Sequence, residues 1–198
     1  MTGPVIVDTG GANIASLQLA IGRLGRSAEL TADPVKITRG SHVFLPGVGA
    51  AADAMARLER AGITEVIPRL TQPVLGICLG MQLLYEASEE GETRCLGVFP
   101  GCVRRMTSAR GRPVPHMGWN RVVLGRDHAL LAGLADGDFA YFVHSYRAPL
   151  GDETVASCDY DASFTAVASR DNFHGAQFHP ERSAALGARF LANFLELS

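Results

Sequence analysis

The chain has 198 residues, of which 47% are hydrophobic and 19% are charged. This composition is typical of a globular fold with a core of its own, and we expect a single domain over residues 1–198. The formal net charge of −2 and the scattered basic residues argue against a nucleic-acid partner. No apolar run reaches signal-peptide or membrane-spanning length, which predicts a cytoplasmic protein without a membrane partner.

In the first half of the chain, short apolar segments alternate with segments of helical periodicity. Strands are expected at residues 5–8, 28–30, 43–45 and 74–77. Helices are expected at residues 13–24, 51–60 and 79–87. Continuous apolar strands that alternate with helices predict an α/β fold, with a central, mainly parallel sheet flanked by helices.

After about residue 97 the pattern changes to short strands separated by Gly, Asp and Pro turns. These strands are expected at residues 97–106, 121–124, 140–143, 154–159, 165–168 and 175–178. They predict an additional, mostly antiparallel strand region in the second half. A final helix is expected at residues 184–197, with one apolar stripe that should pack in the core: Leu186, Phe190, Phe194 and Leu197.

The segment Gly76-Ile77-Cys78-Leu79-Gly80 lies where an apolar strand is expected to turn sharply into a helix. Glycine is needed on both sides of the cysteine, because a side chain there would crowd the turn. The turn places Cys78 at the N-terminus of the helix, whose N–H groups favour a thiolate. Cys78 is therefore a candidate nucleophile, although a lone cysteine between glycines also fits a small buried apolar residue.

The segment Gln177-Phe178-His179-Pro180-Glu181 supplies candidate acid–base groups. Residues two apart share a face of a strand, so His179 and Glu181 can touch. Pro180 has no N–H, so the strand should end here, near a rim of the sheet. His179 is then a candidate general base and acid, with Glu181 fixing its tautomer. Taken alone, His179 is better explained as a structural, hydrogen-bonded histidine.

Donors for an oxyanion are expected from two places. The turn Leu45-Pro46-Gly47-Val48-Gly49-Ala50 follows a strand and can present bare backbone amides. The amide of Leu79, directly after the candidate nucleophile, is a second donor. Because three separate segments supply three complementary roles, covalent catalysis is favoured over three unrelated structural roles.

The cysteines of the chain do not form a metal-binding pattern. Cys78, Cys95, Cys102 and Cys158 include no Cys-x-x-Cys pair and no zinc-finger spacing, so neither a metal nor another cofactor is predicted. A thiolate nucleophile favours a reducing compartment, in agreement with the cytoplasmic expectation.

Several segments carry a family resemblance. The Cys78 turn and the Phe-His-Pro-Glu segment resemble the class I glutamine amidotransferases, in which a Cys-His-Glu triad releases ammonia from glutamine. Three further segments are similar to the glutaminase subunits of imidazole glycerol phosphate synthase, of histidine biosynthesis: Pro46-Gly47-Val48-Gly49, Pro115-His116-Met117-Gly118-Trp119-Asn120 and Tyr141-Phe142-Val143-His144-Ser145-Tyr146. The resemblance spans nearly the whole chain and implies the single-domain class I glutamine amidotransferase fold.

The resemblance implies a heterodimer. This chain would hydrolyse glutamine to glutamate and ammonia, and a separate (β/α)8-barrel cyclase would use the ammonia to make imidazole glycerol phosphate and aminoimidazole carboxamide ribotide. An interface is needed because ammonia that escapes into water is protonated and loses its nucleophilic lone pair. The residues that the resemblance places at or near this interface are Asn13, Met117, Trp119, Asn120, Tyr141 and Arg182. For Trp119, an ordinary core aromatic is the alternative.

The resemblance also implies how glutamine binds. Gln82 and Glu90 would hold its polar groups, although Glu90 with Glu89 is equally compatible with a solvated helix end. The backbone of residues 144–146 (His144, Ser145 and Tyr146) would line the same pocket. An oxyanion donor would be the Val48–Gly49 peptide, which is expected to turn inward only when the cyclase holds its ligand.

Two other functions remain possible alternatives. One is a glutaminase that serves another synthase, such as the pyridoxal phosphate or anthranilate systems, and the Pro115-His116-Met117-Gly118-Trp119-Asn120 run argues against it. The other is a non-catalytic subunit that binds a partner or glutamine without turnover. The joint presence of Cys78, His179 and Glu181 argues against that reading.

Overall fold

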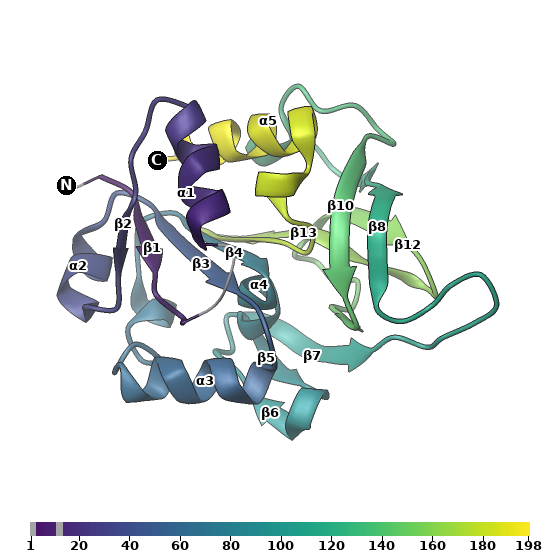
Figure 1. The fold of residues 1–198 in the computed structure, drawn as a ribbon, viewed down its shortest axis with the longest axis horizontal. Helices are drawn as coiled ribbons and strands as arrows, with labels where there is room; N and C mark the ends of the chain where they lie inside the picture. Colours follow the sequence, from purple (N-terminus) through teal and green to yellow (C-terminus); the bar gives the residue numbers. More distant parts are fainter. Residues whose placement is uncertain (1–2, 11–13) are drawn as a thin grey trace.

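The structure, a computed structural model, describes residues 3–10 and 14–198 and is built around an eight-stranded sheet (Figure 1). Its strands are β1 Val5–Val7, β2 Glu29–Thr31, β3 Val43–Gly47, β4 Val74–Cys78, β9 Val123–Leu124, β12 Thr154–Asp159, β13 Ser163–Arg170 and β14 Phe173–Ala176. They are ordered β2-β1-β3-β4-β14-β13-β12-β9. The first five in this order are parallel, and the last three are added antiparallel.

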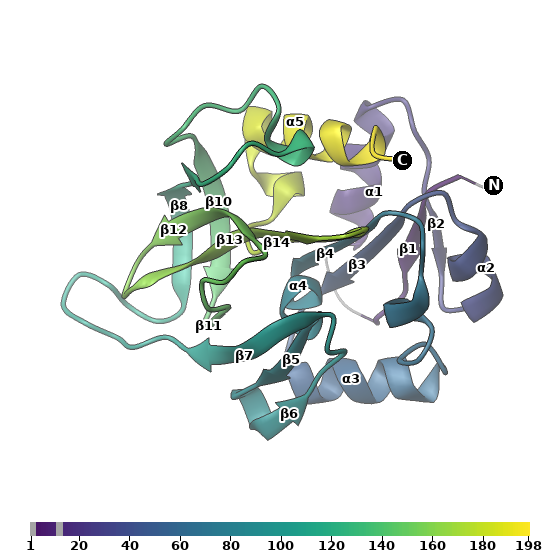
Figure 2. The same ribbon diagram turned by 180° about the vertical axis from the view of Figure 1, so that it is seen from behind.

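Helices cover both faces of the sheet (Figures 1 and 2). The helices that cover these faces are α1 Ile14–Arg23, α2 Pro34–Arg39, α3 Ala51–Arg60 and α5 Ala184–Leu195. The alternation of strand side chains explains this layering, because Ile6 packs in one apolar cluster with α1 and α5, whereas Val5 and Val7 pack in another with α2 and α3. The predicted α/β fold with a mainly parallel, helix-flanked sheet is therefore confirmed.

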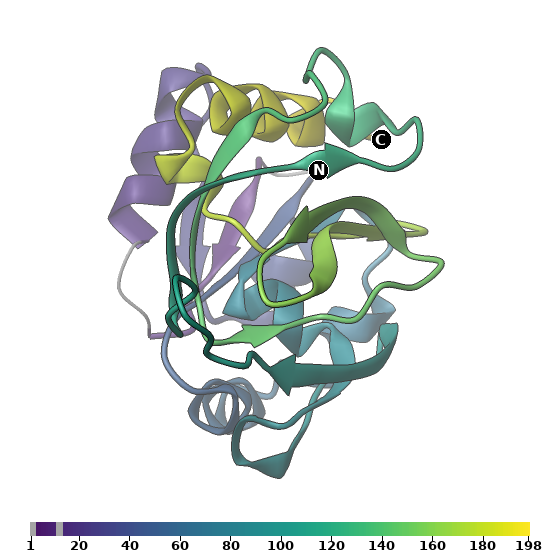
Figure 3. The same cartoon turned by 90° about the vertical axis from the view of Figure 1, so that its right-hand side faces the viewer.

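Two smaller sheets are formed by strands between Tyr85 and Arg147, and Figure 3 views the molecule from their side. One contains β5 Tyr85–Ser88, β6 Thr93–Arg94, β7 Phe99–Arg105 and β11 Tyr146–Arg147, in the order β11-β7-β5-β6. The other pairs β8 His116–Arg121 with β10 Phe139–His144, antiparallel. Short 3-10 turns occur at η1 Ile67–Arg69, η2 Glu90–Glu92, η3 Ala129–Leu131 and η4 Pro180–Arg182.

The expected helix at residues 79–87 is wrong in its second half. Helix α4 covers only Leu79–Leu83, and the chain continues as strand β5. Tyr85 is fully buried with its ring 5.3 Å from the ring of Phe99, and β5 pairs with both β6 and β7. Sheet pairing and burial of this aromatic ring therefore override the helical propensity of the segment.

The last helix packs as predicted. Leu186, Phe190 and Phe194 are buried in the cluster on the α1 face of the sheet, and Leu197 packs against it. Neither α2 nor β8 is predicted by the sequence. Among the helices of residues 3–10 and 14–198, none combines the length and apolarity needed to cross a membrane.

Candidate active site

Cys78 stands at a sharp turn between β4 and α4. Its backbone adopts φ 54° and ψ −110°, a region that residues with a side chain rarely occupy. The turn is tight because α4 lies directly against β3: a Cβ on Gly80 would lie 1.7 Å from the carbonyl oxygen of Leu45. A Cβ on Gly76 would lie 2.7 Å from the carbonyl oxygen of Gly80. The predicted need for glycine on both sides of Cys78 is confirmed.

His179 and Glu181 are in contact, but they do not lie in a strand. Strand β14 ends at Ala176, and Pro180 begins the 3-10 turn η4. The predicted strand geometry for this pair is therefore wrong, because the chain leaves the sheet three residues before the histidine. The turn brings His179 Nδ1 to 2.9 Å from Glu181 Oε1, with side chains that are 9% and 2% exposed.

The electrostatics of His179 favour its charged form. Burial by itself disfavours the imidazolium, but hydrogen bonds to Cys78 and to Glu181 outweigh it and raise the pKa of His179 to about 10. The backbone is fixed as well, since His179 N donates to Tyr141 O at 2.9 Å and Ser183 Oγ donates to His179 O at 2.7 Å. The imidazole is thus held between a carboxylate and a thiol.

Cys78 and His179 open into one cavity of about 320 Å³. Its lining includes the residues expected as oxyanion donors and as glutamine-binding groups. The lining residues are Val48, Gly49, Cys78, Leu79, Gln82, Glu90, Pro115, Val143, His144, Ser145, Tyr146 and His179. Residues from five separate parts of the chain therefore meet at a single cavity.

Gln82 and Glu90 reach the cavity from different elements. Gln82, on α4, donates from Nε2 to Tyr146 O at 2.8 Å and to Gln177 Oε1 at 2.9 Å. Glu90 accepts through Oε2 from the amide of Ala51, at the start of α3, at 2.8 Å. The solvated alternative describes the neighbouring Glu89, which is exposed, and not Glu90.

The wall of the cavity formed by His144 is anchored by a chain of hydrogen bonds. His144 Nδ1 lies 2.8 Å from Tyr146 O, and because a carbonyl only accepts, this nitrogen carries the proton. His144 Nε2 then accepts from His116 Nδ1 at 3.0 Å, and His116 Nε2 accepts from Asn120 Nδ2 at 3.3 Å. Burial lowers the pKa of His116 to about 4 and that of His144 to about 3. Both rings therefore stay neutral, as the chain requires.

Three residues at the site were not singled out from the sequence. Pro115 and Val143 line the cavity, and the Cys78 thiol lies 3.6 Å from the carbonyl oxygen of Val143, to which it donates. Gln177 lies behind the cavity wall and approaches the same sulfur, with Nε2 at 3.8 Å. The one feature of the sequence that points to Gln177 is its place in the segment that carries His179 and Glu181.

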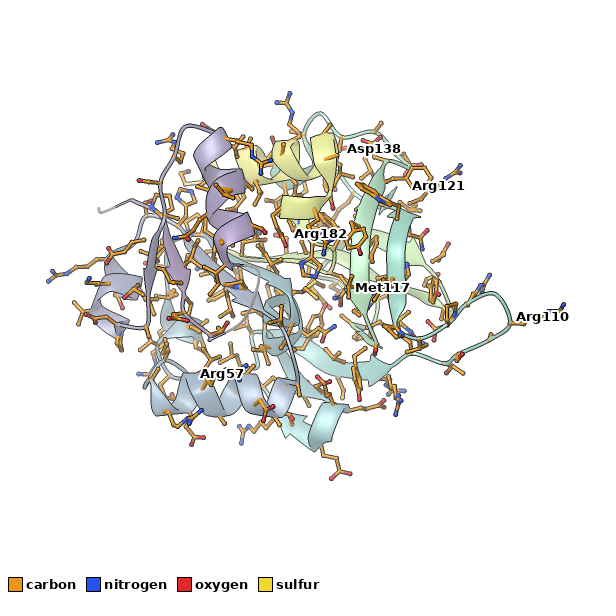
Figure 4. The ribbon with its side chains drawn as sticks, viewed as in Figure 1. Arg57, Arg110, Met117, Arg121, Asp138 and Arg182 are labelled. Carbon is orange, nitrogen blue, oxygen red and sulfur yellow. The ribbon has the colours of Figure 1, made fainter. Side chains whose placement is uncertain are left out.

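An exposed aromatic surface lies beside the site on the outer side of β8 and β10. It consists of the exposed side chains of Met117, Trp119 and Phe139 and the partly buried side chain of Tyr141, and we call it the β8–β10 face. Figure 4 labels Met117 on this face and Arg182 beside it. Trp119 is 52% exposed, which excludes the core alternative. Its ring lies 5.9 Å from that of Tyr141, and the guanidinium of Arg182 lies 4.6 Å from the Tyr141 ring.

Not all of the expected interface residues are on this face. Asn120 alternates to the other side of β8, where it contacts His116 and donates to Asp159 O at 2.9 Å. Asn13 lies outside the described residues.

The chain belongs to the class I glutamine amidotransferase family, whose family model matches residues 5–197. A solved structure described as a glutamine amidotransferase has the same fold, with a TM-score of 0.75 at 20% identity over 97% of each chain. A structure of PurLQS from Thermotoga maritima aligns with a TM-score of 0.71 at 17% identity, over 98% of this chain and 97% of that one. At these identities the structures support the fold alone.

Sequence relatives narrow the family further. The chain is 54% identical over 198 residues to imidazole glycerol phosphate synthase subunit HisH of Xanthomonas axonopodis pv. citri (strain 306), which covers 100% of this chain and 99% of that protein. It is 52% identical over 197 residues to HisH of Xylella fastidiosa (strain Temecula1 / ATCC 700964), covering 100% and 98%. The chain is therefore a homologue of the HisH subunits.

Proposed function

We propose that the chain hydrolyses glutamine to glutamate and ammonia, and that it delivers the ammonia to a partner cyclase of histidine biosynthesis. The observation that carries this proposal is that Cys78 and His179, distant in the sequence, open into the same cavity while Glu181 binds the far side of the imidazole. A thiol, a base and a base-orienting carboxylate form the set that covalent amide cleavage requires. The HisH names of the relatives support the choice of pathway.

In the first half-reaction, the Cys78 thiol passes its proton to His179 Nε2, and the sulfur attacks the side-chain amide carbon of glutamine. A C–S bond forms, and the carbonyl electron pair moves onto oxygen, where the Leu79 amide and the Val48–Gly49 peptide are the proposed donors. His179 gives its proton to the amide nitrogen, the C–N bond breaks and ammonia leaves. A glutamyl thioester remains on the cysteine.

In the second half-reaction, water enters where ammonia left. His179 takes a proton from the water as its oxygen attacks the thioester carbon, and the C–S bond breaks to release glutamate. One water is consumed and one ammonia is formed in each cycle. Glu181 keeps the Nδ1 proton of the imidazole in place throughout, so that Nε2 faces the reacting groups.

Substrate binding is assigned to groups that line the cavity. The Glu90 carboxylate complements the ammonium group of an amino acid, and the Gln82 side chain and the backbone of residues 144–146 offer hydrogen-bonding groups. The Val48–Gly49 peptide is suited to rotation, because Gly49 has φ 89° and a Cβ there would meet nothing within 4 Å. We expect this peptide to turn its N–H inward when the cyclase holds its ligand.

The proposed partner is a (β/α)8-barrel cyclase that converts the ammonia into imidazole glycerol phosphate and aminoimidazole carboxamide ribotide. It would dock on the β8–β10 face, since exposed aromatic residues near an active site are typical of a protein interface. All four cysteines are free thiols, which supports a reducing, cytoplasmic location.

The proposal is tested by measuring glutamate release by the chain alone, with the cyclase, and with the cyclase and its nucleotide substrate. We expect turnover to rise at each step. A glutamine analogue with a diazoketone in place of the amide should label Cys78 once per chain in the complex, and Cys78→Ser should not be labelled. A complex that neither releases glutamate nor takes the label would be a binding module instead.

A further inference from the structure

Gln177 is a fully buried polar side chain next to the candidate site. It is 0% exposed and is not among the residues that line the cavity. Among the residues that the structure describes, its side-chain amide contacts two other side chains within hydrogen-bonding range, Gln82 and Cys78, both of which do line the cavity. A buried amide must satisfy both its donor and its acceptor groups, so its contacts have a defined direction.

One backbone carbonyl fixes that direction. Tyr146 O can only accept, so the Gln82 atom 2.8 Å away is the NH2 group. The same NH2 group lies 2.9 Å from Gln177, whose facing atom must therefore be the acceptor Oε1. The other end of the Gln177 amide, Nε2, then points its N–H at the Cys78 sulfur, 3.8 Å away.

The sulfur thus receives a donor from Gln177 as well as from the imidazole. A hydrogen bond donated to sulfur stabilises the thiolate relative to the thiol, because the charged form is the stronger acceptor. The Val143 carbonyl, 3.6 Å from the sulfur, acts in the opposite sense, since it accepts from the thiol and repels the thiolate. The hydrogen bond from Gln177 offsets the effect of that carbonyl.

The contact with Gln177 also determines the orientation of the Gln82 side-chain amide. Both hydrogens of its NH2 group are used, one on Tyr146 O and one on Gln177 Oε1. The polar atom of Gln82 that remains for a ligand is therefore Oε1, an acceptor. A substrate bound beside Gln82 must present an N–H group to it.

We propose that Gln177 is a positioning residue with two effects: it donates a hydrogen bond to the Cys78 sulfur, and it orients the Gln82 amide so that its oxygen meets the substrate. This proposal rests on the proposed glutaminase function. Gln177 acts through these two residues and does not itself contact substrate.

The test is Gln177→Met, which keeps the length of the side chain and removes both its donor and its acceptor. Alkylation of Cys78 by iodoacetamide, followed across pH in the complex with the cyclase, reports the thiolate directly. We expect Gln177→Met to lower the alkylation rate at pH 7 by about tenfold, because the thiolate loses a hydrogen-bond donor. The KM for glutamine should also rise about tenfold, because the side-chain amide of Gln82 is then free to rotate and no longer keeps its oxygen towards the substrate.

The matched control is Gln72→Met, the same replacement at a partly buried glutamine that hydrogen-bonds backbone carbonyls outside the cavity. It should lower the thermal midpoint without moving the alkylation profile or the KM. Ammonia-dependent synthesis by each complex checks assembly. If Gln177→Met loses stability but keeps the wild-type alkylation profile, the proposed role of Gln177 is overturned.

A second measurement needs no stable variant. In the wild-type chain labelled with ¹⁵N-glutamine, the side-chain Nε2 resonance of Gln177 should titrate together with the Cys78 thiol, and a resonance that stays constant would overturn the proposal. Glutamine turnover by the wild-type complex separates the two ideas: its absence refutes the glutaminase function, whereas the thiol titration still tests the hydrogen bond to sulfur.

Discussion

Cys78 combines a rare backbone conformation with three directional contacts. Its positive φ turns the side chain out of the sheet, where the imidazole of His179, the carbonyl of Val143 and the amide of Gln177 surround the sulfur. Such a residue is held by its surroundings, since an isolated chain would relax to ordinary dihedrals. These contacts hold the sulfur in a reactive position, so replacing Cys78 should affect the glutamine-dependent reaction specifically.

Cys78→Ala should abolish glutamine-dependent synthesis by the complex, by a factor of at least about a thousand, and leave ammonia-dependent synthesis intact. The reason is that supplied ammonia bypasses the cysteine altogether. Both activities are measured on the same preparation. Loss of both would instead assign the thiol a structural role.

His179→Ala should behave like Cys78→Ala, whereas Glu181→Ala should be milder by a factor of about 10 to 100, because the carboxylate orients the imidazole and does not transfer the proton. The comparison is made on kcat for glutamate release by the assembled complex. Equal losses for all three variants would show that Glu181 does more than orient.

Glu181→Gln makes a pH prediction. In the wild type the Glu181 hydrogen bond helps raise the pKa of His179 to about 10, so the imidazolium keeps its proton in alkaline solution. Removing the negative charge lowers this pKa, and the alkaline fall of activity should move to lower pH by about one to three units. The measurement is the ratio of variant to wild-type kcat/KM across pH, which cancels ionisation of the substrate. A ratio that does not depend on pH would contradict the assignment.

At the scale of elements, the site depends on three close approaches of backbone to backbone. Helix α4 touches β3 and β4 at Gly80 and Gly76, and η4 is tied to β10. The first contact tolerates no side chain, since a Cβ on Gly80 would lie 1.7 Å from the Leu45 carbonyl oxygen. The sharp turn at Cys78 is therefore also a packing element of the fold.

Gly80→Ala should lower the free energy of unfolding by about 3 kcal/mol or more, because either α4 or β3 must move to make room. Gly22→Ala is the control: Gly22 lies in helix α1 with nothing within 4 Å of a new Cβ. That variant should gain about 0.5 to 1 kcal/mol. Urea unfolding of both variants gives the comparison, and similar values for the two would refute the close-packing argument.

The sequence predicts the parallel half of the fold well, because β1, β3 and β4 are built on continuous apolar runs between helical patterns. It predicts the contact of His179 with Glu181, but for the wrong reason: a turn that begins at Pro180 replaces the expected strand. Strand β8 is hidden because its inward positions are His116 and Asn120, which read as polar. The role of Tyr85 depends on pairing with β7, which no local pattern reveals.

The candidate site shows the same division. Cys78, His179 and Glu181 are apparent from short segments whose chemistry requires those residue types. Gln177 is not apparent in this way, because its proposed role depends on a sulfur that is 99 residues away in the sequence. Local patterns identify the reacting groups, whereas their supporting contacts appear only in three dimensions.

At the scale of the whole molecule, the cavity and the β8–β10 face are neighbours. The two-stranded sheet turns one side inward, with Phe142 and His144 buried, and the other outward, with Trp119 and Met117 exposed. A partner bound to the outer side would lie one strand thickness from the wall of the cavity. Ammonia released there would have little opportunity to meet bulk water.

Trp119→Ala should weaken binding to the cyclase by about 2 kcal/mol or more, since exposed aromatic side chains near the centre of an interface contribute most of its binding energy. Val35→Ala is the control: Val35 is 56% exposed on α2, on the opposite side of the central sheet from α1. It should change binding by no more than about 0.5 kcal/mol. Isothermal titration calorimetry measures both, and an unchanged affinity for Trp119→Ala would move the docking surface elsewhere.

Tyr141 connects two properties that are usually separable in an enzyme subunit. Its carbonyl accepts from His179 N, its own amide donates to Ser183 Oγ, and its ring carries the Arg182 guanidinium. If the cyclase docks on the β8–β10 face as proposed, a change in its contacts with Tyr141 would also shift His179, so the two surfaces would have to change together during evolution. Hybrid complexes assembled from distantly related organisms should consequently lose turnover before they lose association, which co-purification and glutamate release would separate.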